Sequence, residues 1–283
     1  MFPEALKYSV AKSVNHAIKW LLNTHGSAFD HFSSGILGLL LRVQGVLVVI
    51  PWWAYLVVVA LMAWIATKKI LPTIILAALP LVIGIFGLWA LAIETLALVI
   101  TSVVIALIIG IPLGVVMGEL PLFAGFIQPV LDAMQTMPSF VYLIPAMMLF
   151  GLGKVPAVIA TLIYSLPPVM RLTCLGLRQV PAPAQEAARA YGATRWQLLK
   201  EVRIPLAMPS ILAGVNQTTM MALAMVVIAS MIGARGLGQE VLMAINRIDV
   251  GRGFEAGISI VIMGIVIDRS TQGLARKWDP NNK

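Results

Sequence analysis

Charged residues are scarce in this chain, and that scarcity decides its broad class. Asp, Glu, Lys and Arg make up only 11% of the 283 residues, whereas 60% are hydrophobic. The mean hydropathy is +0.94. Soluble globular domains carry about 25% charged residues, so this composition excludes an ordinary water-soluble domain. The sequence therefore predicts an all-α protein, a polytopic transmembrane helical bundle.

Cysteine and histidine are also rare. The single cysteine, Cys174, lies in a predicted span, which excludes an internal disulfide and a thiolate metal cluster. We interpret it as a small buried apolar residue. The three histidines are His16, His25 and His31, and their spacings of nine and six residues fit no helical metal motif. We therefore expect no metal site in this chain.

Motifs for nucleotide or catalytic chemistry are missing as well. The phosphate-binding pattern G-x-x-x-x-G-K-[ST] does not occur, because Gly151-Leu152-Gly153-Lys154 is too short and is followed by Val155. Zinc-ligand spacing, a nucleophile elbow and a dinucleotide fingerprint are absent from the sequence too. We expect no catalytic residues, and we expect that the chain is not an enzyme. If ATP drives transport here, the hydrolysing site is on another polypeptide.

The net charge of +8 does not call for a nucleic acid partner. Lys and Arg gather in short loops beside apolar segments, where they set the orientation of a membrane protein. The expected surroundings are membrane lipid, with no nucleic acid bound.

Seven apolar segments are predicted as spans, for which roughly 17–25 residues are typical, and the fourth and the seventh are short. The segments are Trp52–Thr67, Ile70–Leu88, Glu94–Met117, Ser139–Leu152, Val155–Leu177, Met208–Ile232 and Phe254–Ile267. The chain ahead of them is polar to amphipathic up to His31 and lacks a signal-peptide cleavage site, so we expect it to be retained. Phe32–Ile50 carries Arg42 and Gln44 within its apolar run, which predicts an amphipathic helix at the membrane interface.

One polar stretch, Gln185–Pro209, lies between two strongly apolar segments. Together with Arg178 just before it, the stretch holds five positive charges against the carboxylates of Glu186 and Glu201. A short loop with such an excess lies in the cytoplasm. Counting spans outward from it places three further parts inside, namely Lys68–Lys69, residues 119–137 and the C-terminus. The same count places residues 233–253 and the N-terminus outside.

Local signals within this stretch predict two short helices. Gln185–Ala190 consists of strong helix formers, and Gly192 can end that helix because it accepts the left-handed conformation of a C-terminal cap. Trp196–Val202 predicts a second helix, which Pro205 stops. A helix–glycine–helix elbow on the cytoplasmic side indicates an element that docks on a partner.

The same stretch resembles the EAA loop of ABC importer permeases, whose pattern is E-A-A-x3-G-x9-I-x-L-P. The matching positions are Glu186, Ala187, Ala188, Gly192 and Pro205, with Val202 and Ile204 as apolar replacements for Ile and Leu. The resemblance implies that these residues couple the chain to an ATPase subunit. The alternative is a cationic loop that only orients the chain. We call residues 185–209 the EAA loop.

Two further stretches are similar to the glycine betaine/proline importer permeases, and the similarity extends over about Glu94–Gln272. They are Leu131–Pro145, ahead of the EAA loop, and Gly214–Gly238, after it. The resemblance implies a type I ABC importer permease fold. We divide the chain into a tail and amphipathic helix (1–50), two transmembrane helices (51–93), a permease core (94–272) and a cytoplasmic tail (273–283).

The resemblance also implies a set of partners in the plasma (inner) membrane. Two copies of the chain would form the pathway, and each EAA loop would dock on one of two ATP-binding subunits, which carry ATP and Mg²⁺. A periplasmic or extracellular substrate-binding protein would deliver the solute, such as glycine betaine, choline, carnitine or proline betaine. The chain itself is expected to bind no cofactor.

Polar residues within the spans are few, and they are the candidates for the pathway. Asn216 and Gln217 could line the path or form hydrogen bonds between helices. Met137 and Pro138, in the first similar stretch, are the other candidates. Gly110, Gly114 and Gly118 recur every four residues, which predicts close approach of a second helix.

Other functions stay open on the sequence alone. A permease for another small solute, such as an amino acid, is compatible with the EAA loop. A passive channel or membrane scaffold without an ATPase partner belongs to a different class. A membrane-embedded enzyme has the least support, because no catalytic motif is found.

Overall fold

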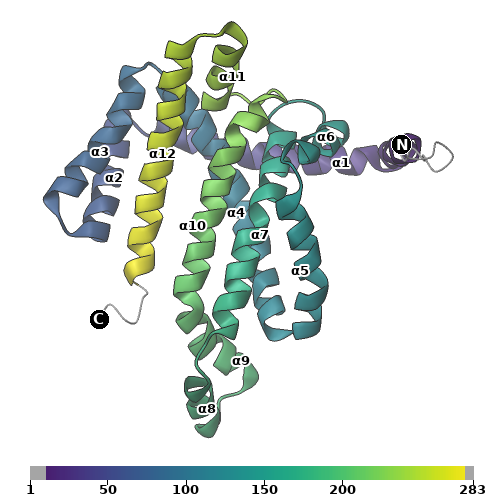
Figure 1. Ribbon diagram of the computed structural model, residues 1–283, viewed down its shortest axis with the longest axis vertical. Helices are drawn as coiled ribbons and strands as arrows, with labels where there is room; N and C mark the ends of the chain where they lie inside the picture. The colour runs from purple at the N-terminus through teal and green to yellow at the C-terminus, as the bar shows by residue number, and fades with distance from the viewer. Residues whose placement is uncertain (1–10, 278–283) are drawn as a thin grey trace, which may run out of the picture.

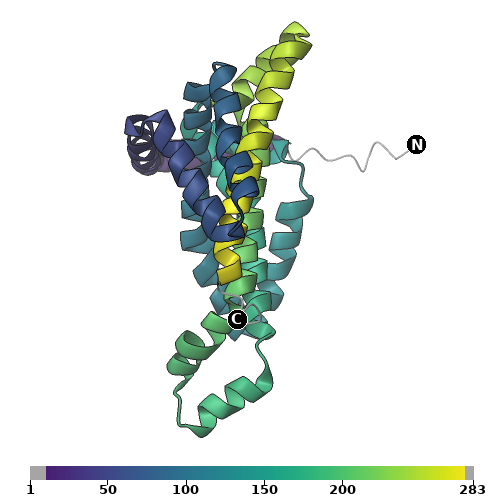
Figure 2. The same ribbon diagram turned by 90° about the vertical axis from the view of Figure 1, so that its left-hand side faces the viewer.

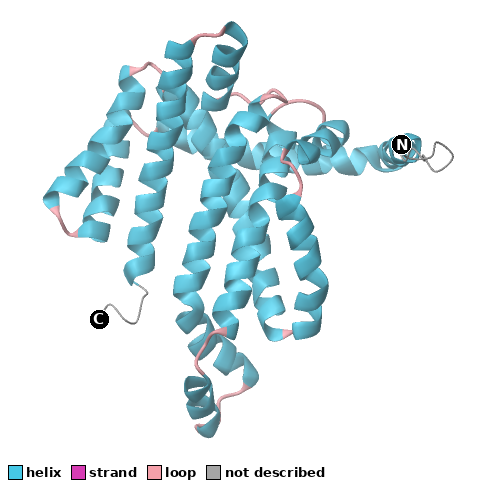
Figure 3. Cartoon of the chain, in the orientation of Figure 1, coloured by secondary structure: helices cyan, strands magenta, loops and turns pink. Residues whose placement is uncertain are grey.

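Helices account for all regular secondary structure in residues 11–277, the part of the chain that this computed structural model describes (Figure 3). This confirms the predicted all-α class. The helices are α1 (Ala11–Val49), α2 (Trp52–Thr67), α3 (Ile70–Ile85), α4 (Trp89–Glu119), α5 (Pro121–Thr136), α6 (Phe140–Phe150), α7 (Lys154–Arg178), α8 (Ala182–Ala190), α9 (Arg195–Gln197), the π-helical turn η2 (Leu198–Arg203), α10 (Ile204–Ser230), α11 (Leu237–Arg247) and α12 (Val250–Lys277).

Helices α4, α7 and α10 form the centre of the bundle, and the EAA loop projects from its lower end in Figure 1. The glycine stripe of α4 faces α7. A Cβ atom added at Gly110 would lie 2.5 Å from Cγ1 of Val169, and one at Gly114 would lie 2.8 Å from the carbonyl oxygen of Met170. Such distances leave no room for a side chain. The predicted close approach of a second helix is therefore confirmed.

The contact between α7 and α10 depends on small residues in the same way. A Cβ atom at Gly176 would lie 2.7 Å from that of Ser210, and one at Gly214 would lie 3.1 Å from the Cα atom of Val169. Where a bundle is surrounded by hydrocarbon, helices associate through such close packing rather than through the hydrophobic effect. The three core helices thus form one tightly packed unit.

The segment between α4 and α7 is a bent pair of helices. Residues 119–137, which the span count places inside, are not an extended connection, because most of them form α5, which folds back along α4 and α7 (Figure 1). Pro121 sits in the first turn of α5, where its missing N–H needs no partner. Helix α6 has 11 residues and is bent by 98° from α5. The hydroxyl of Tyr142 donates to the carbonyl oxygen of Met134 and fixes this bend.

The number of spans differs from the prediction of seven. Among the described residues, five helices are long and apolar enough to cross a membrane, or six if α5 and α6 form one broken span. Helices α2 and α3 have 16 residues each, which gives about 24 Å of length against a hydrocarbon core of about 30 Å. Helix α6, over the predicted span Ser139–Leu152, is shorter still. Hydropathy alone does not show where an apolar run bends.

Helix α1 lies crosswise to the bundle, as Figures 1 and 2 show. It is one of the five helices long enough to span, and it is kinked at His25 (φ −125°, ψ 20°). Its second half packs on α4, α6 and α7. Lys154 of α7 donates to Gln44 of α1 (2.9 Å) and lies 3.2 Å from the carboxylate of Glu94. The interfacial position expected for Phe32–Ile50 stays a prediction.

The remaining helices cover the core from the side of the hairpin α2–α3. Helix α12 packs on α2, α3 and α10, and α11 caps the end of the bundle opposite the EAA loop (Figure 1). Helix α12 reaches Lys277 and so includes the first residues of the predicted tail. The rest of that tail, 278–283, lies outside the described residues, as do residues 1–10 of the predicted N-terminal region.

Candidate functional site: the EAA loop

The EAA loop extends beyond the core helices at one end of the molecule, where both views show it standing clear of the bundle (Figures 1 and 2). Its first helix, α8, begins at Ala182 and has Pro183 in its first turn. The predicted start at Gln185 is slightly late. The side chain of Gln185 donates to the carbonyl oxygen of Val180 (2.9 Å) and holds α8 to the end of α7.

Gly192 forms the elbow of the loop, as the sequence predicts. Its φ angle is +82°, in the left-handed region that side chains disfavour. The N–H of Ala193 donates to the carbonyl of Ala188 (3.1 Å), and that of Gly192 donates to Arg189 (2.9 Å). This pair of bonds is the Schellman motif, which ends a helix at a glycine. The motif fixes the direction in which the chain leaves α8.

The second helix of the loop does not stop at Pro205, and the prediction that it does is wrong. Thr194 starts α9 with a capping box, and the helical path then runs without a break from Arg195 to Ser230. The N–H of Ile204 donates to Leu199, five residues back. Because this π turn interrupts the regular i−4 bonds just before Pro205, the missing N–H of proline falls in a first turn and is tolerated.

The outward surface of the loop carries two large aromatic side chains. Tyr191 is 94% exposed and Trp196 is 69% exposed. Glu186 and Ala187 are also exposed, whereas Ala188 is half-buried. Aromatic residues presented in this way at a polar end of a bundle are typical of a docking surface. The sequence analysis did not identify either residue as a docking candidate, although two aromatic side chains within a polar loop indicate a contact surface.

The inward surface of the loop is apolar and anchors it to the core. Leu198 and Leu199 are buried, and Leu199 packs with Leu177 of α7 and with Ile204. Val202 is half-buried, and Pro205 is exposed. The seven motif residues therefore divide by role. Those on α8 are largely exposed, whereas Val202 and Ile204 belong to the root of the loop.

Two arginines, Arg203 of the loop and Arg178 at the end of α7, bind the end of α4. Arg203 forms an ion pair with Glu119 and donates to the carbonyl oxygen of Leu177 (3.1 Å). Arg178 donates to the carbonyl oxygen of Met117 (3.0 Å). Positive groups near the C-terminal end of a helix are favourable there. A displacement of the loop would consequently be passed to α4 and α7 rather than lost in a flexible linker.

Met137 and Pro138 form the break between α5 and α6. Met137 leaves the helix with extended backbone (φ −68°, ψ 134°), as expected of a residue before proline. Both side chains are exposed. Backbone of this kind at membrane depth must be buried in protein or face a water-filled space.

Asn216 and Gln217 point in different directions from α10. The Nδ2 atom of Asn216 donates to Asp268 of α12 (2.7 Å), and its Oδ1 atom accepts from Thr271 (2.6 Å). Asn216 is thus a bond between helices. Gln217, the next residue, is exposed. Of the four path candidates, Met137, Pro138 and Gln217 are the exposed ones.

No group of three or more His, Cys, Asp or Glu side chains that could hold a metal ion is found within residues 11–277. Cys174 is buried, as expected.

An all-helical membrane bundle with an exposed helix–glycine–helix loop fastened to its core helices defines a permease subunit. The comparison with known families agrees. The chain belongs to the family of binding-protein-dependent transport system inner membrane components, whose pattern matches residues 110–280.

Two of the curated relatives cover nearly the whole chain. This chain is 46% identical over 263 residues to the glycine betaine/proline betaine transport system permease protein ProW of Escherichia coli K12. The aligned region covers 93% of this chain and 74% of that relative. The chain is 42% identical over 269 residues to the glycine betaine transport system permease protein OpuAB of Bacillus subtilis, covering 95% of both. The glycine betaine/carnitine transport permease protein GbuB of Listeria monocytogenes is 51% identical over 201 residues, 69% of this chain and 71% of that relative.

A solved structure supports the fold. The MetNI methionine ABC transporter in an inward-facing conformation matches with a TM-score of 0.60 at 21% identity, over 66% of this chain and 93% of the matched chain. At that identity the likeness concerns the fold alone. It confirms the predicted importer-permease fold.

Proposed function

We propose that this chain forms the translocation pathway of an ATP-driven importer for a quaternary amine, such as glycine betaine, choline, carnitine or proline betaine. The observation that carries the coupling is the EAA loop, whose outer surface is exposed and whose Arg203 is bonded to Glu119 of α4 and to Leu177 of α7. The substrate class is supported by relatives, at 42–51% identity, whose names specify glycine betaine, proline betaine or carnitine.

The partner of the EAA loop is a separate ATP-binding subunit, which holds ATP and Mg²⁺. Glu186 offers a carboxylate at the start of the docking surface. The small side chain of Ala187 allows the ATP-binding subunit to pack closely against α8. Tyr191 and Trp196 supply the large apolar contact area that dominates binding at most interfaces. Closure of two such subunits on ATP would draw the two EAA loops of a dimer together.

The second copy of the chain completes the pathway. Helix α5 presents a row of exposed apolar side chains, which includes Leu122, Phe126 and Val130, and such a face on a membrane subunit fits either lipid or another subunit. We assign the path to the break at Met137–Pro138 and to the face of α10 that carries Gln217. Gln217 is the polar residue of that face, and a hydrogen-bonding group there suits a hydrated solute.

The orientation follows from the charge of the EAA loop. Its four arginines and lysines, together with Arg178 of α7, favour a cytoplasmic position for the loop and for the end of α12 that lies toward it (Figure 1). The substrate-binding protein then docks at the opposite end, over α11. We expect that protein to recognise the ammonium group through a cage of aromatic side chains, since a permanent cation is best held on aromatic faces.

Uptake in cells that lack only this chain tests the proposal. Labelled glycine betaine, choline, carnitine, proline betaine and one ordinary amino acid are compared, with the ATPase and binding protein present. Trimethylamine N-oxide is added to the panel, because relatives at 39% identity are named as permeases for it. Chain-dependent uptake of a quaternary amine is the expected result. Uptake of the amino acid alone would contradict the substrate class, and uptake that persists without the ATPase would contradict the coupling.

A further inference from the structure

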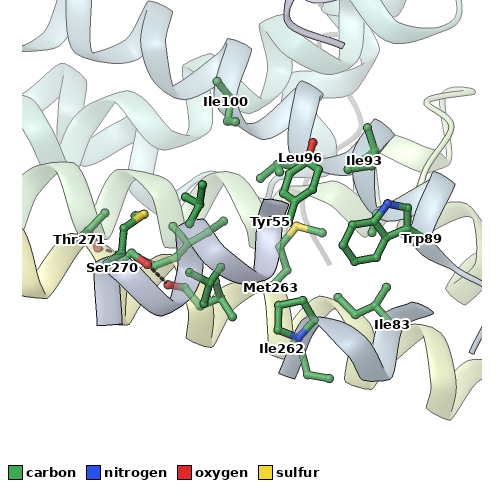
Figure 4. A pocket seen from close by; sticks show the side chains of 17 residues that line it. Tyr55, Ile83, Trp89, Ile93, Leu96, Ile100, Ile262, Met263, Ser270 and Thr271 are labelled. Atoms are coloured by element: carbon green, nitrogen blue, oxygen red, sulfur yellow. Dashed lines mark hydrogen bonds between the residues drawn. The ribbon is translucent and has the colours of Figure 1, made fainter. Parts of the chain in front are cut away.

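An elongated apolar cavity lies between the α2–α3 hairpin and helices α4 and α12 (Figure 4). Its volume is about 330 Å³, and we call it the hairpin cavity. On α12 its lining runs along one stripe from Ile262 to Thr271, which is about 14 Å of helix at 1.5 Å per residue. The cavity is therefore long and narrow, which is the shape of a chain rather than of a compact solute.

The lining offers hydrocarbon only. The hydroxyl of Tyr55 donates to a backbone carbonyl (2.6 Å), that of Ser270 donates to another (2.6 Å), and that of Thr271 is bonded to Asn216 (2.6 Å). The other lining residues are aliphatic side chains, methionine and tryptophan. A polar ligand would find no free hydroxyl to replace its bonds to water. The occupant is consequently apolar.

The two ends of the hairpin cavity differ. Tyr55 and Trp89 stand edge to face at one end, with ring centroids 5.4 Å apart, and Figure 4 places Ser270 and Thr271 at the other. The Ser270 end lies toward the EAA loop, because α12 descends in that direction (Figure 1). A chain with one polar terminus would enter from that end.

Two cations stand at that same end. Arg269 of α12 and Lys69 of the α2–α3 turn line a separate shallow depression together with Thr67. Both basic side chains are exposed. Basic depressions between membrane helices on this side suit a phosphate headgroup.

We infer that the hairpin cavity holds one acyl chain of a bilayer phospholipid, with its headgroup on the EAA-loop side near Lys69 and Arg269. The chain belongs to a family of membrane components, so hydrocarbon is the medium around these helices. The cavity reaches the surface beside Val58, which is 50% exposed. An unfilled gap would forfeit the dispersion contacts of its walls, and an acyl chain restores them.

Two valines on α2 give a matched test. Val59 is buried and lines the cavity, whereas Val57 is 49% exposed and does not line it. The importer complex is extracted in mild detergent, and bound phospholipids are counted by native mass spectrometry. Val59→Phe should retain one phospholipid fewer per permease chain than the unmodified protein, and Val57→Phe should retain the full number. Equal numbers in all three would overturn the inference.

A second measurement probes the unmodified cavity and uses a variant of its wall only for background subtraction. The complex is placed in vesicles of phospholipid brominated either near the headgroup or near the end of the chain, and emission from Trp89 is obtained by difference from Trp89→Phe. Trp89 is at the end of the cavity away from the headgroup. Bromine near the chain end should therefore quench it at least twofold more. Stronger quenching by bromine near the headgroup would mean that Trp89 meets only the surrounding bilayer, and no quenching would mean that no acyl chain reaches it. Either result would overturn the inference.

Discussion

Arg203, in the π turn η2 of the EAA loop, forms an ion pair with Glu119, the last residue of α4. The same guanidinium donates to the carbonyl oxygen of Leu177 in α7. One side chain thus holds the root of the loop against the ends of two core helices. Arg203 is mostly buried, with 14% of its side chain exposed, so loss of its partner leaves a poorly solvated charge.

Replacing Arg203 should uncouple the transporter. We expect Arg203→Met to lower uptake roughly tenfold, a typical size for a lost coupling between sites, while ATP hydrolysis continues. Glu119→Gln should act in the same direction but less. Uptake and hydrolysis are measured in vesicles reconstituted with the ATPase and binding protein. The exposed Lys68 provides a control, since Lys68→Gln should alter neither. Parallel loss of hydrolysis and uptake in Arg203→Met would contradict this role.

The aromatic pair of the EAA loop should dominate docking. Trp196→Ala and Tyr191→Ala should each weaken binding of the ATPase subunit by about 30-fold, the effect of a 2 kcal/mol hot spot. Binding is measured by titrating the purified ATPase subunit onto the immobilised permease. Trp53→Ala serves as the control, because Trp53 is similarly exposed (56%) but lies on α2, far from the loop in sequence. An unchanged affinity in both loop variants would place the docking surface elsewhere.

Much of the EAA loop could be predicted because its signals are local. The alanines of α8 favour a helix, and Gly192 is needed for a positive φ angle, so the neighbouring residues alone indicate the elbow. Pro205 misled for the opposite reason. Its usual effect is to end a helix, and the preceding π turn, in which Leu198 and Leu199 are buried, allows the continuous path.

Contacts between distant segments could not be predicted in this way. Glu119 and Arg203 are 84 positions apart, and nothing in either neighbourhood indicates the other. Helix α5 was missed because residues 119–137 follow an apparent span end and contain two prolines, Pro121 and Pro129, which α5 accommodates. The glycine stripe at Gly110, Gly114 and Gly118 was predicted as a contact surface, but the sequence did not identify α7 as its partner.

The glycine stripe should tolerate no added carbon. A Cβ atom at Gly114 would lie 2.7 Å from that of Thr173 and 2.8 Å from a backbone carbonyl oxygen, neither of which can move freely. Gly114→Ala should therefore destabilise the fold by about 1–3 kcal/mol. The matched change Gly125→Ala, on α5 with nothing within 4 Å, should be neutral or stabilise by up to about 1 kcal/mol. Denaturant unfolding in detergent compares them, and equal midpoints would contradict the packing.

Adjacent residues of α10 should separate stability from transport. Asn216→Leu breaks two bonds to α12 and leaves the carboxylate of Asp268 without this donor, so it should cost about 1–3 kcal/mol of stability. Gln217→Leu removes an exposed polar group and should leave stability within about 0.5 kcal/mol while lowering uptake. Unfolding midpoints and initial uptake rates are measured on both. A stability loss in Gln217→Leu with normal uptake would remove that residue from the path.

The most direct test of the central claim is the distance between the two EAA loops of the assembled importer. The only native cysteine is the buried Cys174, so Cys174→Ser with Lys200→Cys gives one spin label per loop, at an exposed position. Electron spin resonance measures the label-to-label distance without nucleotide and with ATP trapped on the ATPase. The account predicts a distance that shortens by several ångströms on ATP binding, about the size of interface shifts in switching proteins. An unchanged distance in a complex that still hydrolyses ATP would contradict it.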